Sequence, residues 1–199
     1  MVGVNGRESI RIKKAETMMM TRVQPSIKAG DIIAFSGRGW DSILINLCSY
    51  GIPFWSISHV GIIGEHEAKL VLFESTPAQG LSTCDEDRLA DYPGRVWHYP
   101  LYRRLYAAES DRLNQFLMDH LGIPYDHIGA IRSGGAAWSW FESLLRDEDL
   151  SHIFCSELCA ASHREIGMIR TDNVSRWNPN RFIRYERREK ILAPPWRLK

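Results

Sequence analysis

The stretch SISHVGIIGEHEAKLVLFES, residues 56–75, holds two apolar runs separated by the polar tetrapeptide EHEA. Two β-prone runs joined by a short polar segment indicate an antiparallel β-hairpin. If the loop covers residues 65–68, the register places His59 directly opposite Glu74. Directly opposed residues share a sheet face, so this register predicts contact between an imidazole and a carboxylate. The residues expected to form core on the other face are Val60, Ile62, Val71 and Phe73.

The remaining pattern places strands mainly in the first half of the chain and helices in the second. This order favours an α+β fold with one antiparallel sheet packed against helices. Further strands are expected over residues 29–37, 94–101 and 178–187, and helices over 39–51, 109–122 (capped by Ser110), 122–147 and 154–167. The domain organisation that follows is a polar arm over 1–28, one domain over 29–186 and a basic tail over 187–199.

Composition excludes several classes of protein. The chain has 199 residues, 44% of them hydrophobic, which suits one domain with its own core. A net charge of +1 gives no electrostatic case for a nucleic-acid partner. No apolar run is long enough for a transmembrane helix, and the first residues lack the apolar centre of a signal peptide. With four irregularly spaced cysteines, we expect a reducing location, in the cytoplasm or associated with a particle.

The stretch HIFCSELCAASH, residues 152–163, contains two of those cysteines and two histidines at helical spacing. The four side chains share one helical stripe, which resembles a metal site. However, the first and last of them, His152 and His163, lie ~16 Å apart along a helix, which is too far for one zinc ion. A site using two of them with ligands from elsewhere stays open, but we expect no metal and no other cofactor.

Cys155 differs from the other cysteines in its position. It opens the predicted helix, and the positive end of a helix dipole favours the thiolate, which is the nucleophilic form of cysteine. Cys48, Cys84 and Cys159 are expected to be buried small hydrophobes. His152 and His163 are expected at the surface.

Five short motifs together resemble the permuted NlpC/P60 enzymes of the papain-like superfamily. They are AGDIIAF (29–35), SHVGII (58–63), LFES (72–75), GIPYD (122–126) and FCSELC (154–159). The chain is most similar to the YiiX-like branch, which is distantly related to lecithin:retinol acyltransferase. The resemblance implies a circularly permuted papain-like fold, in which the histidine precedes the cysteine. It also implies that Cys155 is the nucleophile, His59 the general base and Glu74 the residue that orients the imidazole.

The function that this resemblance implies is a cysteine-dependent hydrolase acting through an acyl-thioester on Cys155. Its substrate would be a peptide, a cell-wall peptide or a lipid acyl group, and acyl transfer is included. Tyr125 and Trp55 are candidate substrate-binding residues, although packing explains Tyr125 at least as well and explains Trp55 better. The alternative is a non-catalytic structural component of a virion or complex on the same scaffold, with the N-terminal arm as its contact to an assembly partner.

Overall fold

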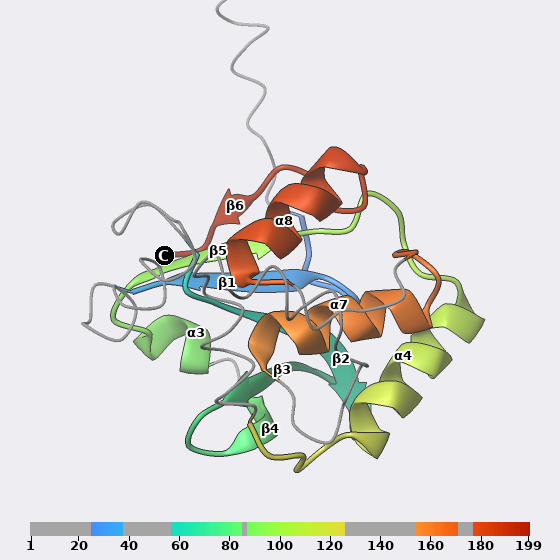
Figure 1. Cartoon of the computed structure of the whole chain (residues 1–199), viewed down its shortest axis with the longest axis horizontal. Helices are drawn as coiled ribbons and strands as arrows, with labels where there is room; N and C mark the ends of the chain where they lie inside the picture. The colour runs from blue at the N-terminus through green and yellow to red at the C-terminus, as the bar shows by residue number, and fades with distance from the viewer. Residues whose placement is uncertain (1–24, 38–56, 85–86, 126–153, 171–176) are drawn as a thin grey trace, which may run out of the picture.

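A six-stranded antiparallel sheet forms the centre of the computed structural model, which describes residues 25–37, 57–84, 87–125, 154–170 and 177–199 (Figure 1). The strand order is β4-β3-β2-β1-β5-β6. The strands are β1 (Ile32–Ser36), β2 (His59–His66), β3 (Lys69–Thr76), β4 (Gly80–Cys84), β5 (Arg95–Tyr99) and β6 (Trp196–Arg197). The sheet and its helices confirm the α+β class.

Three longer helices and one short one accompany the sheet in the described residues. They are α3 (Asp87–Asp91), α4 (Ala107–Asp119), α7 (Cys155–Glu165) and α8 (Pro179–Arg188). Helix α7 packs on β2 and β3, and it also contacts α4 and α8. In Figure 1, α7 and α8 lie in front of the sheet and α4 lies beside it. The helix that begins with Cys155 is therefore the one that covers the central hairpin.

The hairpin of β2 and β3 is present, but its register differs from the prediction. Ile62 pairs with Phe73, and His66 pairs with Lys69. The turn therefore contains only Glu67 and Ala68, both with positive φ, as a tight two-residue hairpin turn requires. The register is shifted by two residues, so His59 is not directly opposite Glu74. A shift of two keeps every side chain on its predicted face.

The main core lies between the sheet and the helices. It contains the buried β2 and β3 residues that the hairpin pattern predicted, Val60, Ile62 and Phe73, with Val71 packed against them. From α7 it takes Leu158, Cys159, Ala160 and Ala161. A smaller cluster on the opposite sheet face contains Ile33, Phe35, Ile63, Leu72 and Val96. The site described below involves residues from both faces.

One predicted element and one predicted helix cap are wrong. Residues 178–187, expected as a strand, form most of α8, because Pro179 starts the helix and the Asn178 side chain accepts the Arg181 N–H at 2.8 Å. Helix α4 begins at Ala107, so Ser110 lies inside it and is not its cap. The helix predicted over 39–51 and most of that over 122–147 lie outside the described residues.

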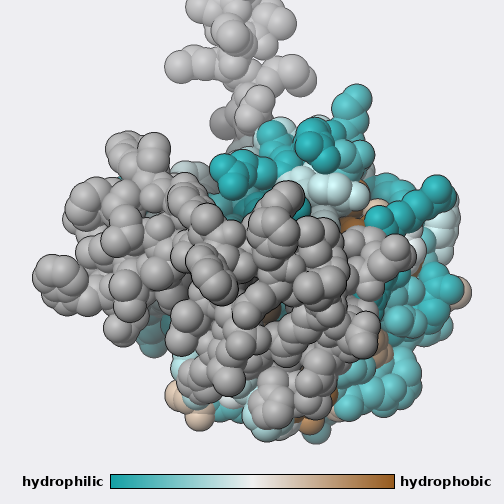
Figure 2. All heavy atoms as spheres, viewed as in Figure 1, coloured by the Kyte–Doolittle hydropathy of each residue, from teal (hydrophilic) through white to brown (hydrophobic). Residues whose placement is uncertain are grey.

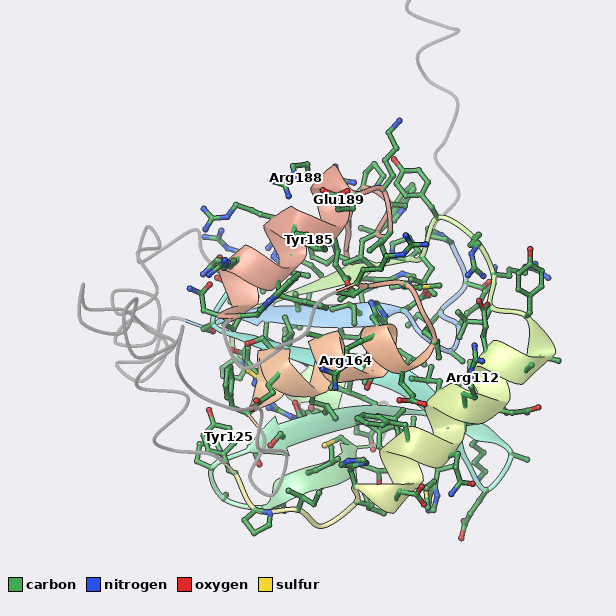
Figure 3. All side chains as sticks on the ribbon, turned by 45° about the vertical axis from the view of Figure 1, so that its right-hand side comes forward. Arg112, Tyr125, Arg164, Tyr185, Arg188 and Glu189 are labelled. Carbon is green, nitrogen blue, oxygen red and sulfur yellow. The ribbon has the colours of Figure 1, made fainter. Side chains whose placement is uncertain are left out.

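The C-terminal segment closes one edge of the sheet. β6 pairs with β5 through Trp196 and Arg197, so this part of the basic tail is packed on the domain. The outer side of α8 is polar, as Figure 2 shows, and in Figure 3 Tyr185, Arg188 and Glu189 lie together near its end. Arg188 donates to Glu189 at 2.9 Å. The domain boundaries remain predictions.

Candidate functional site

Cys155 is the first residue of α7, as predicted. Phe154 precedes it in extended conformation, and its N–H approaches the Glu157 carboxylate at 3.5 Å. Glu157 therefore sits at the N-terminus of the helix, where a negative charge is favourable. The Cys155 side chain is 5% exposed and belongs to the main core cluster. Its backbone N–H is among the first four of the helix, which have no intrahelical acceptor.

His59 and Glu74 are in contact despite the changed register. The His59 Nε2 donates to the Glu74 Oε2 at 2.8 Å, across a diagonal of the hairpin. Gly61 follows His59 by two residues on β2, and a Cβ added there would lie 2.8 Å from the Phe73 carbonyl oxygen and 3.4 Å from the Glu74 Cβ. The glycine therefore allows the close approach of the two strands beside Glu74. The imidazole–carboxylate contact predicted from the sequence is present, although the geometry assumed for it is not.

The Glu74 carboxylate has two further partners. Its Oε1 accepts from the Arg88 Nε at 2.9 Å and from the Cys84 thiol at 3.0 Å. Glu74 is only 1% exposed, and this burial raises the pKa of its carboxyl group. The hydrogen bond and charge of His59, followed by the hydrogen bonds of Arg88 and Cys84, outweigh burial and lower that pKa to about 2. Glu74 is therefore a carboxylate at neutral pH.

The imidazole of His59 also interacts electrostatically with the Cys155 thiol. Burial lowers the pKa of His59, but the charge and hydrogen bond of Cys155 and those of Glu74 outweigh it and raise the pKa to about 10. Because Nε2 is bonded to Glu74, Nδ1 is the ring nitrogen left for the thiol. The His59 side chain is 19% exposed, so the group is reachable from solvent. The three residues predicted from the sequence are thus brought together.

The other predicted residues have mixed outcomes. Cys159 is fully buried one turn behind Cys155, as expected. Cys84 is not a plain buried thiol, because it is only half-buried and donates to Glu74. Tyr125 is half-buried. In Figure 3 it lies on the opposite side of the view from Arg112 of α4. Its role in substrate binding remains a prediction. Trp55, Cys48 and His152 lie outside the described residues.

His163, expected at the surface, is completely buried. Its Nε2 donates to the Gly30 carbonyl at 2.9 Å, and its Nδ1 shares a 2.6 Å hydrogen bond with Glu186 of α8. Position 163 is eight residues after Cys155, so it continues the inner stripe of α7 toward the sheet. The helical spacing of His163 is visible in the sequence. Its acidic partner, Glu186, lies in the segment that the sequence pattern predicts to be a strand.

A second buried pair lies at the start of β1. Asp31 accepts from the His98 Nε2 at 2.7 Å and from the Leu101 N–H at 2.9 Å. Asp31 also lines a cavity of about 770 Å³ at this end of the sheet, with Lys28, Arg103 and Arg104 among the other lining residues. None of Cys155, His59 or Glu74 lines this cavity.

Two absences apply to the residues that the structure describes. Within them, no group of three or more His, Cys, Asp or Glu side chains is placed to hold a metal ion. No helix in the described ranges is long and apolar enough to cross a membrane.

Comparison with known proteins identifies a structural relative. No family model matches the chain, and no curated protein matches it in sequence. The crystal structure of the metalloprotein YiiX from Escherichia coli O157:H7 is similar, with a TM-score of 0.52 at 18% sequence identity. The match covers 84% of this chain and 87% of that one. The likeness shows a shared YiiX-like α+β fold, and at this identity it carries no more than the fold.

Proposed function

We propose that this protein is a cysteine-dependent hydrolase with a circularly permuted papain-like fold. The observation that carries the proposal is one connected set of side chains. A carboxylate holds an imidazole at 2.8 Å, and that imidazole interacts electrostatically with a thiol at the first residue of a helix. This is the arrangement of nucleophile, base and orienting group that nucleophilic catalysis needs. The YiiX-like fold is compatible with it.

In the proposed reaction, the Cys155 sulfur attacks the carbonyl carbon of an amide or ester. The raised pKa of His59 favours the imidazolium form, so the ring takes up the proton that the thiol loses during the attack. The negative charge that develops on the carbonyl oxygen is stabilised by the Cys155 backbone N–H at the start of α7. The imidazolium then gives its proton to the leaving amine or alcohol, which leaves an acyl-thioester on Cys155.

Deacylation reverses the roles. His59, now neutral, takes a proton from water or another acceptor, which attacks the thioester and releases the acid or the transferred acyl product. Glu74 keeps the same ring nitrogen bonded through both steps, so that Nδ1 remains the catalytic nitrogen. The substrate class is a peptide, a cell-wall peptide or a lipid acyl ester.

The test is a panel of peptide, muropeptide and lipid-ester substrates, with intact-mass detection of the acyl-thioester. Wild type is expected to turn over at least one class and to gain the acyl mass. Cys155→Ala should lose both signals, and Cys159→Ala, a matched change one turn away, should keep both. Glu74→Gln should reduce turnover less than His59→Ala does, because the amide oxygen can still accept from the imidazole.

A chelator control belongs in the same experiment. A metal bound to the thiol would mask it, so a chelator should leave turnover unchanged or raise it, whereas turnover that vanishes with a chelator would contradict a metal-free thiol mechanism. Turnover that survives Cys155→Ala would contradict the assignment of the nucleophile.

A further inference from the structure

Glu74 depends on more than His59 for its orientation. Its Oε2 is used by His59, whereas its Oε1 accepts from Arg88 and from Cys84. The Glu74 side chain is 2% exposed, so water can contribute little to holding it. The partners on Oε1 therefore decide which way the plane of the carboxylate faces.

Arg88 is itself held by two aromatic rings. Its guanidinium carbon lies 5.4 Å from the centre of the Phe35 ring and 5.3 Å from that of Tyr92. The Phe35 and Tyr92 rings contact each other edge to face, with 4.8 Å between their centres. The centre of the Phe35 ring also lies 5.5 Å from that of the His59 ring. Guanidinium groups stack favourably on aromatic rings, so the side chain has a defined place although it is 35% exposed.

We propose that Arg88 is a positioning residue, which fixes Glu74 and through it the His59 ring. This proposal rests on the proposed function, because it assigns Arg88 a part in the same site. An exposed arginine–carboxylate pair usually contributes little to the stability of a protein. Here the carboxylate is buried, the guanidinium is stacked, and the bond shares its acceptor oxygen with the Cys84 thiol. Arg88 contacts neither of the reacting atoms.

A merely structural role for Arg88 makes a different prediction from a positioning role. If Arg88 acts through the Glu74 carboxylate, its removal matters only while that carboxylate is present. If it serves only the packing of α3, its removal has the same effect with or without the carboxylate. Double-mutant cycles separate these cases, because coupled residues give non-additive effects.

The experiment measures the rate of iodoacetamide alkylation at Cys155, resolved by peptide mass spectrometry. It compares wild type, Arg88→Gln, Glu74→Gln and the double variant. We expect Arg88→Gln to slow alkylation about fivefold when Glu74 is present and to change it less than twofold in the Glu74→Gln background. The matched control is Arg184→Gln, an exposed arginine on α8, which should leave the rate unchanged.

The pH profile provides an independent readout. The ratio of the Arg88→Gln rate to the wild-type rate should fall between pH 7 and pH 4, since Glu74 is then easier to protonate. Arg88→Lys should restore part of the rate, because it keeps the charge and loses the stacked planar group. If Arg88→Gln does not fold, Arg88→Lys is measured in the same two backgrounds, with a smaller loss expected only when Glu74 is present.

The outcomes separate the two proposals. Equal effects of Arg88→Gln in both backgrounds, with a flat rate ratio, would overturn the positioning role and leave the cysteine mechanism standing. A wild-type Cys155 that is alkylated no faster than an ordinary buried thiol would overturn the proposed function, and the positioning role with it.

Discussion

Removing the carboxylate of Glu186 should destabilise the fold strongly, although the residue lies in a segment that reads as a basic surface. Glu186 and His163 are both 0% exposed and share a 2.6 Å hydrogen bond. Breaking a buried pair by deleting one partner costs about 3–5 kcal/mol, because the other polar group is left unpaired. Glu186→Ala should therefore lower the unfolding free energy by about that amount. In a chain of this size, the melting temperature should fall by about 6–20 °C.

Two matched variants define the origin of the effect. Glu186→Gln keeps an oxygen that can face His163, so it should cost about 1–3 kcal/mol. Glu189→Ala removes a carboxylate three residues later whose side chain is 45% exposed, and it should change stability by less than about 0.5 kcal/mol. The assay is urea unfolding followed by circular dichroism. A loss below about 1 kcal/mol for Glu186→Ala would refute the reasoning.

The same pair predicts a pH dependence of stability. Burial lowers the pKa of His163, but the charge and hydrogen bond of Glu186 outweigh it, so the net shift is upward. Burial raises the pKa of Glu186 by more than His163 lowers it. A raised folded-state pKa gives stability that is present below the ordinary pKa and lost as pH rises. The advantage of wild type over Glu186→Gln should thus be largest below about pH 4.5 and shrink as pH rises, with a further loss above pH 6.5. An advantage that grows with pH would contradict this reasoning.

Further predictions concern the site and its supports. Cys159→Ala should cost about 1–3 kcal/mol in urea unfolding, since the thiol is fully buried, and leave Cys155 reactivity intact. Gly61→Ala should lower both stability and Cys155 alkylation, because the new Cβ would meet the Phe73 carbonyl at 2.8 Å; an unchanged alkylation rate would be contrary evidence. Glu74 has a pKa lowered to about 2, so its stabilising contribution is present above pH 4.5 and lost toward pH 2. The free energy of unfolding of the Glu74→Gln variant, measured as the pH is lowered, should therefore lack this loss of stability toward pH 2.

The sequence predicted the parts of the site that depend on periodicity. Alternation along the hairpin identified the faces correctly, because an error of two residues in the register preserves the alternation. The start of α7 at Cys155 was also predicted. The direct opposition of His59 and Glu74 was wrong, because Glu67 and Ala68 adopt positive φ and shorten the turn, which the residue types did not suggest.

Long-range partners could not be predicted in this way. Arg88 reaches Glu74 from a short helix after β4, and nothing in the local pattern around it distinguishes it from a surface arginine. Glu186 was hidden in a run of arginines, and only the three-dimensional contact with α7 shows that it faces inward. Both cases involve polar contacts between segments distant in sequence, which periodicity does not encode.

The most direct test of the central claim compares alkylation rates of the described cysteines at pH 7 in the folded protein. Cys84 is half-buried, Cys155 is 5% exposed and Cys159 is fully buried. Accessibility alone therefore predicts that Cys84 reacts first. Activation by His59 predicts instead that Cys155 reacts first, and that His59→Ala returns it to the slow rate of a buried thiol. Reaction led by Cys84, or a Cys155 rate indifferent to His59→Ala, would contradict the account.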